Sequence, residues 1–261
     1  MIIPAASDVA FNIGSVSIYW YGILMACAIL IAFLVANKLG QNLFAKKDFI
    51  IEYAPIIIIS GILGARLYFC LLNCGHYFYH PLEILDIREG GLSIHGALIG
   101  GICALLYTAK RNNIPFLSLL DTFSCGTILG QAIGRWGNYF NSEAYGLPIA
   151  NQNWGLYIPE GRRISQYANF SLYHPTFLYE SVLNLISFGV LLFIFKKCSN
   201  KYRGVTFFSY LTIYAVIRFF IEQIRIDSAL NIGTIPIAVI VSIILFITGL
   251  IGIIFCLKTH E

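Results

Sequence analysis

The chain has 261 residues, of which 58% are hydrophobic and only 11% are charged, and its mean hydropathy is +0.76. About a quarter of the residues of a soluble globular domain are charged. The composition therefore excludes a soluble globular protein and predicts an all-α, polytopic integral membrane protein. The net charge of +4 reflects basic residues that flank the apolar segments, so it does not indicate nucleic-acid binding.

Seven apolar segments are long enough, or nearly so, to cross a membrane as helices. About 20 apolar residues span the hydrocarbon core of a bilayer. The first segment lacks the basic flank of a signal peptide and is too long to be one. We therefore expect about seven transmembrane helices in a single domain, residues 1–261. The segments cover approximately residues 17–37, 54–74, 92–109, 116–133, 175–195, 204–222 and 235–257.

Basic residues predict the orientation of the chain in the membrane. Alternate loops divide into two sets, one with ten Lys and Arg residues and the other with five. Short loops rich in Lys and Arg remain in the cytoplasm. We therefore expect the N-terminus outside the cell and the C-terminus in the cytoplasm. The polar segment 135–174 then forms a loop or small head on the outer side.

The densest group of polar side chains begins this segment, in the run GRWGNYFNSEAYG (residues 134–146). The run places one arginine, two asparagines and one carboxylate close together: Arg135, Asn138, Asn141 and Glu143. A guanidinium offers a planar fork of donors that matches a phosphate. Because the run lies beside a membrane, we expect its ligand to be the phosphate of a lipid headgroup.

Ionisable residues within the apolar segments form a second group. Such residues are unfavourable in lipid and usually mark function; here they are Arg66, Glu180, Arg218 and Glu222. Tyr214, Arg218, Glu222 and Arg225 are spaced by 4, 4 and 3 residues, which predicts one face of a helix. Two interpretations remain open. One is an ion-pair network among the four ionisable residues Arg66, Glu180, Arg218 and Glu222. The other is a site for an anionic ligand, which an excess of arginine over carboxylate favours.

His95 follows a glycine pair in the run GGLSIHG (residues 90–96), at the outer end of the third apolar segment. The glycines allow the backbone to turn or to approach another segment closely. A histidine here is either a general base or a structural residue, and both interpretations remain open. His174 precedes a proline that is typical of a first helical turn, so we interpret it as a cap or a tie to the outer loop.

Small residues and cysteines have simpler interpretations. The glycine pairs 61/64 and 96/100 predict close packing between helices. The seven cysteines are odd in number and lie mostly within apolar segments, where thiols act as small apolar side chains. Cys70 and Cys74 lie near two histidines, but their spacing is not that of a tight metal site. We therefore expect no metal and no cofactor.

Taken in order, these motifs resemble the bacterial prolipoprotein diacylglyceryl transferases. The arginine–asparagine run is the most specific of them. Three small departures replace a usual glycine, glycine and glutamine by Ala97, Ser142 and Phe177, and none removes a charged or acid–base group. The matching blocks are WYG (20–22), GxxGxR (61–66), GGLSxHG (90–96), GRxGNxxxNxExxG (134–146), HPxxxYE (174–180) and YxxxRxxxExxR (214–225).

The resemblance implies an enzyme that moves the diacylglyceryl group of phosphatidylglycerol to the thiol of the lipobox cysteine of a preprolipoprotein. A thioether forms and glycerol phosphate leaves, in the first step of lipoprotein maturation. The implied location is the bacterial plasma (inner) membrane, with the active site toward its outer face. The implied partners are phosphatidylglycerol, preprolipoproteins and the lipid bilayer, and not nucleic acid.

The resemblance also implies the site residues. The catalytic set is His95, Arg135 and Arg218. The chemistry agrees, because a departing phosphate requires positive charge and a thiol of ordinary pKa, about 8.5, requires a base or a positive field to ionise. The phosphatidylglycerol-binding set is Tyr21, Arg135, Asn138, Asn141, Glu143, Glu222 and Arg225.

Two other classes of protein fit parts of the pattern. A secondary transporter for an organic anion would use the arginine stripe as its binding site, but such transporters usually contain internal repeats and broken helices, and the sequence contains no repeat. A lipid-binding scaffold without activity would not require His95, Arg135 and Arg218 on one side of the membrane.

Overall fold

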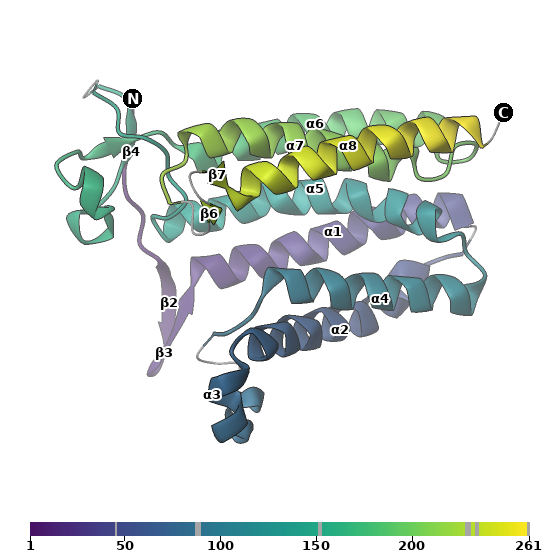
Figure 1. The fold of residues 1–261 in the computed structure, drawn as a ribbon, viewed down its shortest axis with the longest axis horizontal. Coiled ribbons are helices and arrows are strands. Elements are labelled where there is room, and N and C mark those ends of the chain that lie inside the picture. The colour runs from purple at the N-terminus through teal and green to yellow at the C-terminus, as the bar shows by residue number, and fades with distance from the viewer. Residues whose placement is uncertain (45, 87–89, 151–152, 228–230, 233–234, 260–261) are drawn as a thin grey trace. The chain divides into compact units, whose positions relative to one another are not determined.

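Long helices dominate the computed structural model, which describes residues 1–44, 46–86, 90–150, 153–227, 231–232 and 235–259 (Figure 1). The chain divides into two compact units. The first unit contains residues 1–36 and 121–261, and the second contains residues 37–120.

Seven long helices correspond to the seven apolar segments. They are α1 (Trp20–Phe44), α2 (Phe49–Leu72), α4 (Ile94–Asn112), α5 (Phe116–Phe140), α6 (Thr176–Cys198), α7 (Val205–Ile224) and α8 (Ile237–Lys258).

Six of these helices, all but α4, are long and apolar enough to cross a membrane. Helix α4 has 19 residues, with His95 near its start and Lys110 and Arg111 in its last turn. These polar ends lower its hydropathy. Over the described residues, the structure thus supports a mostly helical, polytopic membrane protein with six candidate spans, where the sequence predicted about seven.

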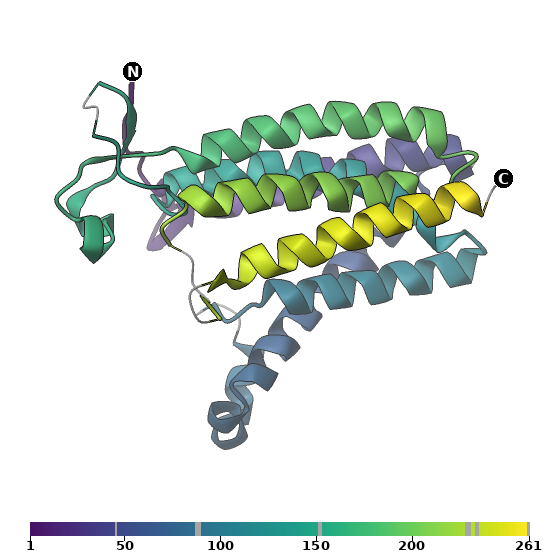
Figure 2. The same cartoon turned by 45° about the horizontal axis from the view of Figure 1, so that its top comes forward.

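In the first unit, α5, α6, α7 and α8 run side by side (Figures 1 and 2). Gln131 of α5 donates a hydrogen bond to the hydroxyl of Tyr210 on α7, at 3.0 Å. Helix α1 approaches α5 where Gly126 faces Ala32, and a side chain at Gly126 would overlap the Ala32 carbonyl. Helices α7 and α8 pack closely in the same way at Gly249, which lies against Thr212.

Asp121, near the start of α5, holds the N-terminus of α7. This fully buried carboxylate accepts hydrogen bonds from the backbone N–H of Gly204 at 2.7 Å and of Phe207 at 2.8 Å. The first N–H groups of a helix have no partner within the helix, and negative charge is favourable there. Asp121 therefore satisfies α7 from a neighbouring helix, a role that the sequence analysis missed.

The described residues between α5 and α6, 141–150 and 153–175, form a small folded segment. Its strands β4 (Gly155–Tyr157) and β5 (Leu172–Tyr173) pair antiparallel, and β1 (Ile2–Ile3) adds to β4 in parallel, in the order β1-β4-β5. The 3-10 helices η2 (Glu160–Arg162) and η3 (Ser165–Tyr167) complete it.

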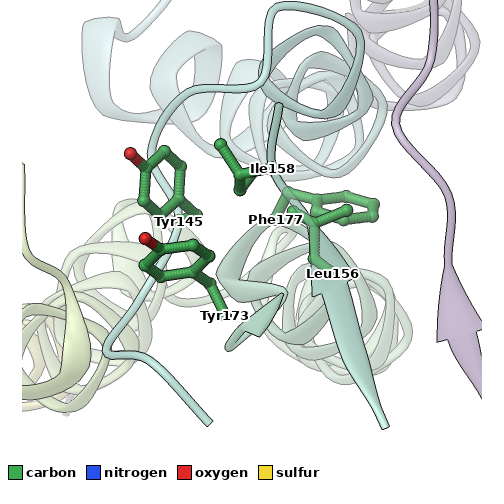
Figure 3. Close-up of a cluster of buried hydrophobic side chains, with 5 residues drawn as sticks. All are labelled: Tyr145, Leu156, Ile158, Tyr173 and Phe177. Atoms are coloured by element: carbon green, nitrogen blue, oxygen red, sulfur yellow. The ribbon is translucent and has the colours of Figure 1, made fainter. Parts of the chain in front are cut away.

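A buried apolar cluster supports this segment: Tyr145, Leu156, Ile158, Tyr173 and Phe177 (Figure 3). Tyr145 also donates a hydrogen bond to the carbonyl of Arg162. The sequence predicted that the loop or head would begin at Arg135. Helix α5 continues to Phe140, so its last two turns carry the first half of the polar run.

Two short hairpins complete the first unit. Strands β2 (Val9–Ile13) and β3 (Val16–Tyr19) form one, and β6 (Asn231–Ile232) and β7 (Ile235–Pro236) form the other.

In the second unit, α2 packs against α4 through glycine. Side chains at Gly64 and Gly96 would each overlap the carbonyl oxygen of the other residue, and one at Gly100 would overlap that of Ser60. Small residues let two backbones approach closely within a membrane, so the predicted glycine packing is confirmed. The connection from α2 to α4 contains α3 (Cys74–Tyr79) and the 3-10 helix η1 (Pro81–Leu85).

Candidate functional site

Arg135 lies near the C-terminal end of α5, and a buried carboxylate holds its side chain in place. Its Nη2 donates to Oε1 of Glu180 at 2.6 Å, and its Nη1 donates to Oδ1 of Asn138 at 3.3 Å. The Glu180 side chain is 4% exposed and that of Arg135 is 23% exposed. Glu180 therefore orients a guanidinium that remains partly open to its surroundings.

The rest of the polar run forms one hydrogen-bonded network with Arg135. The amides of Asn138 and Asn141 both donate to Oε1 of Glu143, at 2.8 and 3.4 Å. The chain reverses at Ser142, whose φ of 52° is left-handed. Glycine adopts this conformation without strain, whereas a residue with a side chain adopts it rarely.

Helix α7 carries the second arginine–carboxylate pair. Nη2 of Arg218 lies 2.5 Å from Oε2 of Glu222, and the two side chains are 15% and 2% exposed. The buried Nη1 of Arg218 has no hydrogen-bond partner among the described residues. Buried polar groups are nearly always hydrogen-bonded, so this donor is a rare exception within the described part of the chain.

Arg225 forms the third pair. It lies just beyond the end of α7, in extended conformation, and not on the helix as its spacing predicted. Its Nε donates to Oδ1 of Asp227 at 2.5 Å, and the other oxygen of Asp227 accepts the backbone N–H of Ala144 at 3.0 Å. The N–H of Leu147 donates to the Ile224 carbonyl at 2.8 Å. These contacts attach the polar run to the end of α7.

Electrostatic interactions indicate that the three pairs share one neighbourhood. Burial lowers the pKa of the Arg225 guanidinium, but its hydrogen bond to Asp227 and the charges of Asp227, Glu222 and Glu180 outweigh burial and raise the pKa above its ordinary value. Glu222 is the partner of Arg218 and Glu180 that of Arg135. The pairs therefore gather where α5 ends, α6 begins and α7 ends.

The sequence analysis expected an excess of arginine over carboxylate in this group. That expectation is wrong for the described residues, because Arg135, Arg218 and Arg225 each have a carboxylate partner. The group instead contains the partly exposed guanidinium of Arg135 and the buried Nη1 of Arg218, which has no hydrogen-bond partner among the described residues. Both suit an anionic ligand that adds to the ion pairs already present.

Tyr21 lies beside the polar run. A side chain at Gly137 would contact the Tyr21 ring, with its Cβ 2.8 Å from the nearest ring atom, so the ring rests on α5 one residue before Asn138. The ring of Trp20 stacks on Phe140, with centroids 5.1 Å apart. The start of α1 is thus a neighbour of the polar run on α5.

His95 belongs to the second unit, where it lies in the first turn of α4. It is exposed, and its ring lies 5.9 Å from the ring of Tyr68 on α2. The preceding backbone is tied to α2, because the N–H of Ser93 donates to the Ala65 carbonyl at 3.1 Å. All other residues of the predicted site belong to the first unit.

Of the ion-pair network considered for Arg66, Glu180, Arg218 and Glu222, the described part of the chain contains the pair of Arg218 and Glu222. Arg66 donates to backbone carbonyls of its own unit, whereas Glu180 pairs with Arg135.

His174 connects the outer segment to the start of α6, as the sequence predicted. Its carbonyl accepts the N–H of Gly146, its N–H donates to Leu147, and its Nδ1 lies 3.1 Å from the hydroxyl of Tyr179.

The sequence analysis did not single out two residues that hold the site together, Asp227 and Ser181. The only sign of the role of Asp227 in the sequence is its position two residues after Arg225. Ser181 was also missed: it accepts a hydrogen bond from the indole N–H of Trp136 at 3.2 Å and donates to the Ala132 carbonyl at 2.8 Å. It thus fixes α6 against α5 one turn from Arg135.

The fold and the site define a polytopic helical membrane protein with three arginine–carboxylate pairs gathered where α5 ends, α6 begins and α7 ends. Residues 8–255 match the family model described as prolipoprotein diacylglyceryl transferase. The chain belongs to this family.

Named relatives agree with this membership. A phosphatidylglycerol–prolipoprotein diacylglyceryl transferase of Trichormus variabilis is 42% identical over 256 residues, which cover 97% of this chain and 90% of the relative. The protein of the same name from Acaryochloris marina is 42% identical over 243 residues, 93% of this chain and 88% of the relative. That from Bacillus cereus strain G9842 is 39% identical over 253 residues, 97% of this chain and 93% of the relative.

Proposed function

We propose that this protein transfers the diacylglyceryl group of phosphatidylglycerol to the thiol of the lipobox cysteine of a preprolipoprotein, in the first step of lipoprotein maturation. The observation that carries the proposal is family membership over residues 8–255. The names of the relatives supply both substrates, the phospholipid and the prolipoprotein. The protein is thus a transferase, and its arginine pairs supply groups that the reaction requires.

In the reaction a sulfur–carbon bond forms at the glycerol carbon of the lipid, and the carbon–oxygen bond to the phosphate breaks. Glycerol phosphate leaves with the electron pair, while the thiol proton passes to a base. Negative charge therefore grows on the phosphate in the transition state. Donors that are already oriented toward this charge stabilise it most.

Arg135 and Arg218 are the donors in this proposal. Glu180 holds Arg135 in one orientation at 2.6 Å, so little rearrangement is needed when phosphate binds. The unused Nη1 of Arg218 provides a buried hydrogen bond that strengthens as the phosphate becomes more negative. Arg225 and its partner Asp227 attach the polar run to the end of α7 and so keep the run in place.

The remaining polar residues are assigned to the lipid headgroup. Asn138, Asn141 and Glu143 form one network with Arg135, and Tyr21 lies against the same face of α5. Glu222 contributes by holding Arg218. His95 is assigned to thiol activation, either as the general base or by orienting the reactants, and no cofactor is required.

The proposed location is the bacterial plasma (inner) membrane, with several spans and the active site at the outer face. The N-terminus then lies outside and the C-terminus in the cytoplasm, which requires an odd number of spans and therefore α4 as the seventh. The residues between α5 and α6 form the outer head. The uneven distribution of Lys and Arg supports this orientation. So does the position of Lys196, Lys197 and Lys258, which lie in the last turns of α6 and α8.

A reconstituted assay tests the proposal directly. Purified protein is incubated with phosphatidylglycerol and a lipobox peptide, and mass spectrometry follows the mass of the peptide. We expect the mass of one diacylglyceryl group to be added at the cysteine, with release of glycerol phosphate. A peptide with Cys→Ser is the matched control. Unchanged mass of the cysteine peptide, or modification of the serine control, would contradict the proposal.

A further inference from the structure

Arg66 is a buried arginine that holds a backbone loop. It lies on α2 and is 7% exposed. Its Nε donates to the carbonyl of Ile84 at 2.9 Å, and its Nη2 donates to that of Glu83 at 2.5 Å. Its Nη1 donates to both Gly90 and Gly91, at 3.1 Å each. In the described part of the chain it has no carboxylate partner, and the hydrogen bonds of its guanidinium go to backbone carbonyls of the loop.

The loop is shaped to receive this side chain. Gly90 and Gly91 have φ values of 91° and 73°, which side chains rarely adopt. A Cβ at Gly91 would overlap Nη1 of Arg66 and lie 2.9 Å from the ring of Phe69. The turn therefore favours glycine at both positions, and the close approach of the guanidinium favours it at Gly91 as well.

The same stretch of α2 also holds the residues around His95. Ala65 accepts the N–H of Ser93 at 3.1 Å, and the ring of Tyr68 lies 5.9 Å from that of His95. Residues 65–68 of α2 therefore lie beside both the loop and the first turn of α4. In this arrangement, Arg66 fixes the turn from which α4 begins.

We propose that Arg66 is a positioning residue for the transfer reaction, which acts by holding the Gly90–Gly91 turn and so the placement of His95. The inference rests on the proposed role of His95. Arginine suits this task because its planar guanidinium presents five N–H donors in a rigid fork, whereas lysine has one nitrogen on a flexible chain. A shift of about 1 Å caused by a remote mutation can slow an enzyme by about 10²-fold.

The test compares Arg66→Lys, His95→Gln and the double variant in the peptide assay. We expect Arg66→Lys to lower kcat by about 10²-fold with little change in KM for phosphatidylglycerol. We expect the double variant to be about as slow as His95→Gln alone, because Arg66 acts through His95. Arg111→Gln is the matched control, since this arginine lies at the end of α4 and contacts the Tyr107 hydroxyl; its activity should be unchanged.

A second variant covers the case in which Arg66→Lys does not fold. Gly91→Ala disturbs the same contact from the loop and keeps the arginine. It should show the same loss of kcat and the same lack of additivity with His95→Gln. Losses that multiply in either double variant, or full activity of the single variants, would overturn the proposal.

The outcomes separate this inference from the proposed function. If His95→Gln is slow and Arg66→Lys and Gly91→Ala are fully active, only the role of Arg66 is wrong. If His95→Gln has the wild-type rate, the role of His95 is wrong and the inference about Arg66 fails with it. Transfer by the wild-type protein remains a separate observation in both cases.

Discussion

At the scale of single residues, the site depends on how each arginine is held. Arg135 is oriented by Glu180 and remains partly exposed, whereas Arg218 is more deeply buried beside Glu222. Under the proposed function, the first arrangement would admit a phosphate, and the second would stabilise charge that develops inside the protein. Substitutions at the two positions should therefore have different effects.

Arg135→Ala should abolish lipidation of the peptide. Arg135→Lys should restore little activity, because lysine cannot donate to Glu180, Asn138 and a phosphate from one planar group. Mass spectrometry of the lipobox peptide measures both. Near-normal turnover by the lysine variant would show that the planar fork is not used.

Arg218→Gln should lose activity while the protein still inserts and folds. Glu222→Gln should lower both the activity and the free energy of unfolding. The loss of stability should be on the order of 3–5 kcal/mol, because the substitution leaves the Arg218 charge buried without its partner. Thermal unfolding in detergent, measured beside peptide turnover, separates the two effects. The roles are reversed if Arg218→Gln unfolds the protein and Glu222→Gln changes neither property.

His95→Gln should slow transfer by roughly 10²–10⁴-fold if His95 is the general base. Raising the pH should then recover part of the rate, because more of the peptide thiol, of ordinary pKa about 8.5, ionises without a base. Binding of phosphatidylglycerol should be unchanged. A flat pH–rate profile together with weakened lipid binding would instead assign His95 to orientation of the lipid.

At the scale of elements, helix ends and helix crossings are stabilised by contacts from distant parts of the chain. Asp121 of α5 supplies acceptors for the start of α7, and Ser181 of α6 connects α5 through Trp136. Such contacts fix the rotation of each helix about its axis. The rotation of α7 in turn decides whether Arg218 faces the protein or lipid.

Asp121→Ala should destabilise the protein by about 0.5–2 kcal/mol, the usual effect of losing a helix cap. The reason is that the N–H groups of Gly204 and Phe207 both lose their acceptor. Asp121→Asn retains one acceptor oxygen and should be less harmful. Melting temperatures of the three proteins in one detergent test this order, and equal temperatures for all three would contradict it.

At the scale of the whole molecule, the orientation in the membrane remains a prediction from charge. A C-terminal fusion to alkaline phosphatase should be inactive, because that enzyme requires an oxidising compartment, and a fluorescent protein at the same position should fluoresce. A phosphatase fusion after Leu72, at the end of α2, is the matched control and should be active. The opposite pattern would invert the proposed topology and move the site to the inner face.

The sequence alone was sufficient for the features that depend on neighbouring residues. Runs of apolar residues predicted all seven long helices, because helix formation in lipid depends on local hydrophobicity and on satisfying the backbone within the segment. The blocks around Arg135 and Arg218 identified the family that the comparisons confirm. Glycine spacing also predicted the close crossing of α2 and α4.

The tertiary structure decided the features that depend on which distant groups meet. Sequence could not pair Arg135 with Glu180, assign Arg66 to carbonyls of the Gly90–Gly91 turn, or place Asp121 at the start of α7. Spacing along one helix shows which residues share a face, but not what that face contacts. A buried charge is stabilised by whichever partner the packing brings within hydrogen-bonding distance, and packing is a property of the whole fold.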